Sequence, residues 1–158
     1  MLTVNLYTFG KLKEPHWREA SAEYAKRLSA YCKLNIIELS EARLPENPNE
    51  AQINQALEAE ASQLLPKLKG YSIALCIEGK MYTSEVLAKN IESLTVDGIS
   101  TINLIIGSSH GLSEAVKSIC KLRLSMSEMT FPHQLARIML LEQLYRALSI
   151  NASSKYHK

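Results

Sequence analysis

Two turns in the second half of the chain combine glycine, histidine and small polar residues, and each directly follows an apolar run. The first, Gly107 to Gly111, follows the run 102–106, which is typical of a strand buried on both faces. Gly107 permits a sharp exit where a side chain would collide with neighbouring atoms. The second, Ser127 to Phe131, follows alternating apolar residues and precedes Pro132, which favours the start of a helix. The spacing therefore predicts two strand ends that bring two loops close together.

The glycines of the first turn belong to neither of the common phosphate-binding motifs. The chain lacks both the Gly-x-Gly-x-x-Gly pattern of dinucleotide folds and the Gly-x-x-x-x-Gly-Lys-Ser/Thr phosphate loop. Taken alone, Gly107 and Gly111 also fit a strand-to-helix turn that binds nothing. His110 and His133 lie in the two loops and are candidate bases, but a histidine beside a helix start also fits a capping role.

The remaining residues predict the elements that must position these loops. Strands are expected at 2–9, 34–39, 72–77, 101–106 and 122–126, and helices at 15–31, 50–65, 84–94, from 113 onward and at about 133–148. This repeated β-α-β order predicts an α/β fold, with a mainly parallel sheet covered by helices on both faces. The polar segment 40–49 contains Pro45 and Pro48, so we expect it to be irregular and mobile.

Three local signals refine the expected boundaries. Ser113 can cap a helix whose first turn carries the acidic Glu114, and Ser84 can cap the helix that follows it. Glu78-Gly79-Lys80 is expected to turn the chain out of the third strand. The region 75–79 is thus a third exit from the predicted sheet.

Length and composition fit one compact domain over residues 1–158. The chain has 46% apolar and 22% charged residues, enough to bury a core. Its net charge of +2 is too small to indicate a nucleic-acid-binding protein by itself. The distribution is uneven, because residues 1–100 carry 11 basic and 13 acidic side chains and residues 101–158 carry 7 and 3. The basic part of the chain is the part that contains the two loops.

The cysteines and the N-terminus favour a cytoplasmic protein. Cys32, Cys76 and Cys120 show no Cys-x-x-Cys spacing and no nearby histidine, so we expect buried reduced thiols and no metal site. The first residues lack a basic segment followed by a sustained apolar core, and no run approaches the roughly 20 residues that span a bilayer.

The last predicted helix has more apolar surface than one docking stripe requires. Its apolar positions are Leu135, Ile138, Met139, Leu140, Leu141, Leu144, Tyr145 and Leu148. A symmetric homodimer would cover the second surface. The alternative is a helix deeply buried in its own domain.

Five ordered motifs resemble the RlmH-type family of SPOUT-class RNA methyltransferases. They are IEGK at 77–80, IGSSHGL at 106–112, MSEMTFPHQLAR at 126–137, EQLYRA at 142–147 and YHK at 156–158. One departure is Ser108, which stands where the family usually has a second small glycine.

The resemblance implies an enzyme that uses S-adenosyl-L-methionine to methylate N3 of a pseudouridine in 23S ribosomal RNA. It also implies a homodimer and a C-terminal segment threaded into a trefoil knot. Because the net charge is small and no separate RNA-binding domain is expected, we hypothesise that the substrate is the assembled 70S ribosome, recognised by shape. Alternatives from other classes are a non-catalytic ribosome-associated protein of the same fold and a flavodoxin-like or nucleotide-binding module.

The same resemblance assigns candidate site residues. The cofactor-binding candidates are Leu75, Gly107, Met126, Ser127, Glu128, Met129, Thr130 and Phe131. By itself the position of Leu75 favours a core residue, so its assignment to the cofactor depends on the resemblance. The catalytic candidates are Tyr156, to stack on or hydrogen-bond the target base, and His157, to handle a proton or contact a phosphate.

Arg146, Lys155 and Lys158 are the RNA-binding candidates. Arg146 would bind the RNA backbone or hold an acidic residue of the other subunit. For Arg137, a salt bridge within the chain is as good an interpretation as a contact with RNA. The tail 149–158 would look much the same if it were only a solvated, disordered end.

Overall fold

Five strands form an entirely parallel sheet in the computed structural model, which describes the backbone of residues 1–156 and the side chains of residues 1–153. The strand order is β2-β1-β4-β3-β5. The strands are β1 (Thr3–Phe9), β2 (Lys33–Leu39), β3 (Tyr71–Met81), β4 (Thr101–Ile105) and β5 (Leu122–Ser125). The predicted parallel sheet is confirmed.

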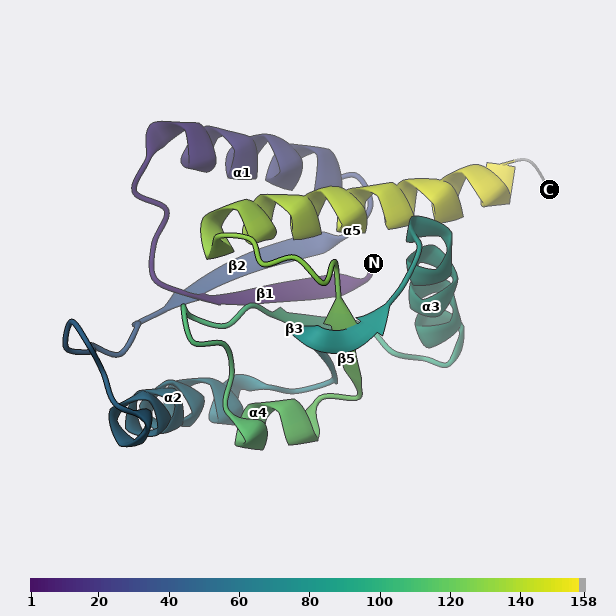
Figure 1. Ribbon diagram of the computed structural model, residues 1–158. Helices are drawn as coiled ribbons and strands as arrows, with labels where there is room; N and C mark the ends of the chain where they lie inside the picture. The colour runs from purple at the N-terminus through teal and green to yellow at the C-terminus, as the bar shows by residue number, and fades with distance from the viewer. Residues whose placement is uncertain (157–158) are drawn as a thin grey trace.

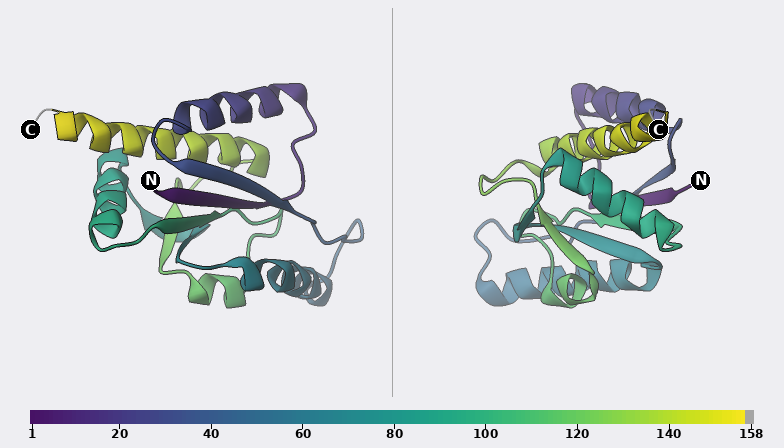
Figure 2. Two further views of the ribbon diagram at one scale, coloured as in Figure 1. Left: turned by 180° about the vertical axis from the view of Figure 1, so that it is seen from behind. Right: turned by 90° about the vertical axis from the view of Figure 1, so that its right-hand side faces the viewer.

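Helices cover both faces of this sheet, as predicted. The helices α1 (Pro15–Leu28), α3 (Ser84–Val96) and α5 (His133–Tyr156) supply one apolar core, and α2 (Glu50–Leu64) and α4 (Glu114–Ile119) supply the other. A short 3-10 helix, η1 (Leu65–Lys67), continues α2. Figure 1 shows α1 and α5 side by side above the sheet with α2 and α4 below it, and both views in Figure 2 agree.

A row of polar side chains crosses four neighbouring strands on the α2 and α4 side. Asn35 Nδ2 donates to Asn5 Oδ1 at 2.9 Å, and Asn5 Nδ2 donates to Asn103 Oδ1 at 3.1 Å. Asn103 Nδ2 then donates to Ser72 Oγ at 3.1 Å and to the carbonyl of Lys69 at 2.8 Å. Because a slip of one residue would send these side chains to opposite faces, the row fixes the register of β2, β1, β4 and β3.

The third strand continues past the point where a turn was predicted. Glu78-Gly79-Lys80 stays within β3, and the register with β5 shifts so that Leu75 and Lys80 both pair with Leu124. A Cβ atom at Gly79 would lie 2.5 Å from the carbonyl oxygen of Arg123. Glycine therefore allows a bulged β3 to pass close to β5, and the expected turn at 78–80 is wrong.

One predicted helix cap is confirmed and the other is wrong. Ser113 Oγ accepts from the backbone N–H of Val116 at 3.2 Å, as expected for the cap of α4. The cap of α3 is Thr83, whose Oγ1 accepts from Val86 N at 3.1 Å. Ser84 instead donates from Oγ to Gln143 Oε1 at 2.6 Å and ties α3 to α5.

Helix α5 begins near the predicted residue but extends beyond the predicted end near Leu148. Residues 149–153 remain helical, and Asn151 Nδ2 donates to the carbonyl of Ala88 in α3 at 3.0 Å. Disorder from residue 149 onward is therefore wrong for this part of the tail. The buried leucines of α5 contact the core that α1 and α3 share. Burial within its own chain thus accounts for much of the apolar surface of α5. Within residues 1–156, no helix is both long and apolar enough to cross a membrane.

Candidate functional site

A cavity of about 730 Å³ opens beyond the ends of β4 and β5, beside residues 75–78 in the middle of β3. Three segments line it: residues 75–78 of β3, residues 106–112 after β4, and residues 125–133 from the end of β5 onward, with the exception of Glu128. Lys117 and Ala136 also line the cavity. The carboxyl ends of parallel strands meet at one edge of a sheet, which is the usual place for a ligand in α/β folds. The structure therefore brings together the three segments singled out in the sequence.

The wall formed by residues 107–111 is a turn closed tightly on itself. Gly111 N–H donates to the carbonyl of Ser108 at 2.8 Å, and Gly111 has a φ of +84°, which favours glycine. A Cβ atom at Gly107 would overlap the carbonyl oxygen of Gly111. The collision predicted for a side chain at this exit is confirmed, and the compact turn leaves backbone atoms on the cavity surface.

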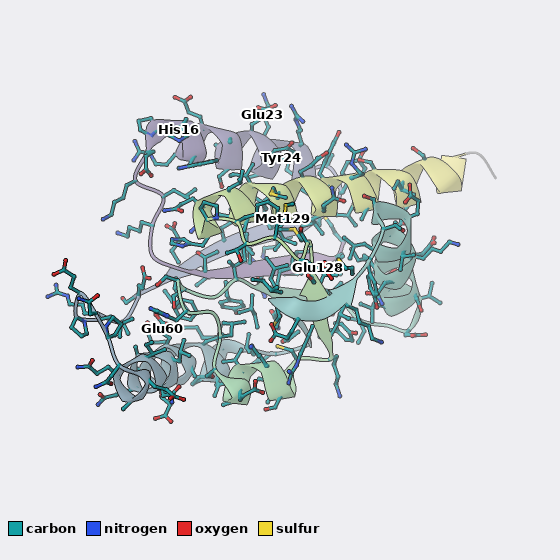
Figure 3. All side chains as sticks on the ribbon, in the orientation of Figure 1. His16, Glu23, Tyr24, Glu60, Glu128 and Met129 are labelled. Carbon is teal, nitrogen blue, oxygen red and sulfur yellow. The ribbon has the colours of Figure 1, made fainter. Side chains whose placement is uncertain are left out.

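The wall formed by residues 126–131 is organised by Ser127. Ser127 Oγ accepts from the N–H of Met129 at 3.0 Å, and Ser125 Oγ donates to the Ser127 carbonyl at 3.0 Å. Met129 lines the cavity with 74% of its surface exposed, and the neighbouring Glu128 is exposed to solvent (Figure 3 labels both). Of the eight cofactor-binding candidates, only Glu128 does not line the cavity.

Two opposite charges, which the sequence interpretation did not assign, also line the cavity. Lys117 Nζ in α4 lies 2.6 Å from Glu78 Oε1 in β3, and these are the only Lys, Arg, Asp or Glu side chains among the lining residues. The hydrogen bond from Lys117 lowers the pKa of Glu78, and the same bond raises the pKa of Lys117. Both side chains are therefore charged near neutral pH. Glu78 lies in the IEGK motif at 77–80, but Lys117 has no sequence signal beyond its place in a short helix.

The histidines lie at different depths of this cavity. Both line it; His110 is exposed, and His133, at the start of α5, is half-buried. Neither donates or accepts a side-chain hydrogen bond among the described residues. The structure is thus compatible with ligand contact by either ring and assigns neither a base role.

Arg137 forms a salt bridge with Glu38, which was one of the two roles considered for it from the sequence. Its guanidinium is buried, and Nη1 donates to Glu38 Oε2 at 2.8 Å. Nη2 donates to Thr8 Oγ1 at 2.9 Å and to the Gly10 carbonyl at 3.4 Å. This clamp fixes the first turns of α5, and hence the cavity wall at Ala136, against the ends of β1 and β2.

The RNA-binding and catalytic candidates lie away from this cavity or outside the described residues. Arg146 is exposed on α5, and its Nη2 contacts Glu142 Oε1 at 2.7 Å. The predicted roles of Lys155, Tyr156, His157 and Lys158 concern side chains outside those that the structure describes. Glu142 lines a second cavity of about 330 Å³, between α3, β5 and α5, which shares Ser125 and Met126 with the first.

Most basic side chains in the second half of the chain have acidic neighbours. Of the five Lys and Arg side chains described after residue 100, Lys117, Arg123, Arg137 and Arg146 form ion pairs, the longest being Arg123 to Glu114 at 3.6 Å. Among the side chains that the structure describes, the basic excess of this region is therefore largely neutralised locally.

The cysteines are free thiols in the structure. Cys32 and Cys76 are buried as predicted, whereas Cys120 is half-buried. Burial raises the pKa of Cys32 and of Cys120 to about 11. Among the described residues, no three His, Cys, Asp or Glu side chains are grouped closely enough to hold a metal ion.

Comparison with known families identifies the class of protein. A family model described as "Predicted SPOUT methyltransferase" matches residues 2–157. The chain therefore belongs to the SPOUT methyltransferase family.

Relatives named "Ribosomal RNA large subunit methyltransferase H" match over their whole length. The protein of Leuconostoc mesenteroides subsp. mesenteroides is 45% identical and that of Clostridium novyi is 47% identical, each over 99% of this chain and 100% of the relative. A solved structure described as a probable methylase family protein from Haemophilus influenzae Rd KW20 is 13% identical with a TM-score of 0.53. It covers 99% of this chain and 70% of that one. The latter similarity concerns the fold alone.

Proposed function

We propose that this protein transfers a methyl group from S-adenosyl-L-methionine to N3 of a pseudouridine in 23S ribosomal RNA. The observation that carries the proposal is the convergence of residues 75–78, 106–112 and 125–133 on one cavity. Family membership and the names of the relatives support methylation of large-subunit ribosomal RNA. The choice of pseudouridine and of N3 rests on the resemblance of the sequence motifs.

The cavity residues fit this cofactor. Leu75, Leu112 and Phe131 supply apolar surface for an adenine ring, and the tight turn at Gly107 leaves backbone groups able to read its edge. When bound, the cofactor supplies a methyl group that its sulfonium has already made electrophilic. The protein must therefore mainly bind and orient the two reactants.

Glu78 and Lys117 are suited to the amino-acid end of the same cofactor. A carboxylate and an ammonium group 2.6 Å apart match the ammonium and carboxylate groups of a zwitterion. Glu78 keeps a second oxygen, and Lys117 keeps two further N–H donors, for those contacts. This assignment places the adenine against the glycine turn and the charged end against α4.

The acceptor side is proposed to require the C-terminal residues. N3 of a uracil-type ring is a weak acid, so a modest base or a shifted equilibrium suffices. Tyr156 would hold the target base and His157 would handle the proton or contact a phosphate. Arg146, Lys155 and Lys158 would contact the RNA backbone.

A homodimer is proposed to complete this side of the site. Met81, Val86 and Met129 expose large apolar surfaces, and the first two flank Tyr82 to Ser84, which line the second cavity. A second copy covering this surface would bring its own C-terminal residues towards the first cavity. The trefoil knot implied by the resemblance remains a prediction.

Recognition is proposed to depend on the shape of the assembled 70S ribosome in the cytoplasm. Because most described basic side chains after residue 100 are paired, this part of the chain offers little free charge for binding RNA unaided. We expect efficient methylation of intact 70S particles and weak methylation of naked RNA. Equal methylation of both would contradict this part of the proposal.

Mass spectrometry of ribosomal RNA fragments tests the reaction itself. Cells without the gene should lose one methyl group at a pseudouridine of 23S RNA, and the wild-type gene should restore it. Unchanged fragments would contradict the proposal. Calorimetry separates the alternatives, because a non-catalytic relative would bind ribosomal RNA without the cofactor, and a nucleotide-binding module would prefer a nucleotide or flavin.

A further inference from the structure

Glu60 is a buried carboxylate that does not line the cavity. It lies in α2 and is 3% exposed (Figure 3). Burying a carboxylate costs free energy unless hydrogen bonds replace its lost water. The partners of Glu60 therefore show which parts of the fold depend on it.

Those partners come from two separate loops. Ser108 Oγ donates to Glu60 Oε1 at 2.7 Å, and the backbone N–H of Ala42 donates to Glu60 Oε2 at 3.0 Å. Ser108 lines the cavity, and its own carbonyl accepts the bond that closes the turn from Gly111. Glu60 thus holds the cavity turn from behind and ties it to the segment 40–49.

This contact is the main side-chain anchor of the turn. Ser109, His110 and Gly111 are exposed, and Ser108 is the only described residue of 107–111 whose side chain forms a hydrogen bond. A turn with one side-chain anchor loses order when that anchor is removed, and a disordered turn must be ordered again when a ligand binds.

We propose that Glu60 is a positioning residue that holds turn 107–111 in its ligand-binding conformation before the cofactor enters. This inference rests on the proposed function, because it assigns the cofactor to the cavity that the turn lines. Glu60 acts through Ser108 and needs no contact with the cofactor. The inference also explains why this chain carries serine at 108, since a glycine there could not reach the carboxylate through a side chain.

Gln63 provides a matched control on the same helix. Its side chain accepts from Ser40 N at 3.2 Å and donates to the Ser40 carbonyl at 2.9 Å, so it also anchors the segment 40–49. It forms no hydrogen bond with the cavity turn. A variant at Gln63 therefore reports the loss of loop anchoring alone.

The test compares Glu60→Ala, Glu60→Gln and Gln63→Ala with the wild-type chain. Calorimetry measures the Kd for S-adenosylhomocysteine, and hydrogen exchange measures the backbone amides of 108–111 without ligand. We expect about tenfold weaker binding and faster exchange for Glu60→Ala, as for loss of a hydrogen bond to a charged group. Glu60→Gln should restore both within about twofold, because its amide can accept from Ala42 and donate to Ser108. Gln63→Ala should change neither.

Each other result has a definite meaning. Unchanged Kd and exchange in Glu60→Ala, or equal losses in Gln63→Ala, would overturn the inference. If Glu60→Ala fails to fold, Ser108→Ala replaces it, since it removes the anchor and keeps the Ala42 contact, and it should show the same faster exchange. Wild-type protein that does not bind S-adenosylhomocysteine would contradict the proposed function, while the exchange of residues 108–111 would still test Glu60.

Discussion

The Cβ atom that Gly107 lacks would overlap the carbonyl oxygen of Gly111, at the other end of the cavity turn. The two backbones approach so closely that the turn excludes every residue except glycine at position 107. The tightness of this turn thus depends on the missing side chain at position 107.

Gly107→Ala should abolish cofactor binding, with at least a hundredfold rise in Kd, because the turn must open to make room for the alanine side chain. Forcing an extra carbon into a packed site also costs about 1–3 kcal/mol of stability. Gly98→Ala is the control, because Gly98 has a φ of +89° with no atom near its missing Cβ and lies outside the cavity. It should cost about 1–2 kcal/mol in urea unfolding and leave Kd unchanged. Binding by Gly107→Ala would show that the turn does not contact the cofactor.

Lys117→Met should weaken binding of S-adenosylhomocysteine by about tenfold, as expected when a charged hydrogen-bond donor is lost. Methylthioadenosine, which lacks the amino-acid end, should bind both proteins equally in competition calorimetry. Parallel losses for the two ligands would mean that Lys117 supports the cavity without contacting the charged end of the cofactor.

The Glu78–Lys117 pair should also give the stability of the protein a specific dependence on pH. Hydrogen bonding to Lys117 lowers the pKa of Glu78 in the folded state below its ordinary 4.5. Glu78 therefore takes up a proton less readily in the folded chain than in the unfolded chain. The pair thus stabilises the fold above pH 4.5, and this contribution is lost as the pH falls through the pKa that Glu78 has in the folded state. Urea unfolding from pH 7 down to 3 should show a steeper acid loss in the wild-type chain than in Glu78→Gln. If the free energy of unfolding falls equally steeply with pH in both proteins, the Glu78–Lys117 pair does not contribute to stability as described.

Asn103→Ala should destabilise the fold by about 2–3 kcal/mol, because Asn103 is fully buried and its loss leaves several buried polar groups without partners. Asn35→Ala, at the half-buried end of the same row, should cost about 1 kcal/mol or less. Urea unfolding measures both. Equal losses in the free energy of unfolding would show that Asn103, at the centre of the sheet, contributes no more to the row than Asn35 at its end.

Much of this arrangement could be predicted from the sequence because its signals are local. The apolar run 102–106 ending in Gly107, and the Ser113 cap followed by Glu114, each specify a strand end or helix start through neighbouring residues. The β-α-β order then determines that the strand ends lie at one edge. Seven of the eight cofactor-binding candidates consequently lie around one cavity.

The features that were missed depend on residues far apart in the chain. Gly79 suggested a turn, but its role is a close approach to the carbonyl of Arg123. Helix α5 passes the predicted end at Leu148 because no glycine or proline stops it and Asn151 finds a partner on α3. Glu60 resembles any polar residue on an exposed helix face until Ser108 and Ala42 are placed beside it.

A crystal structure with S-adenosyl-L-methionine or S-adenosylhomocysteine tests the central claim most directly. We predict density for one nucleoside per chain between Leu75, the Gly107 turn and residues 126–131, with its amino-acid end near Glu78 and Lys117. Density at any other place on the chain, or none at saturating ligand, would contradict the assignment of this cavity to the methyl donor.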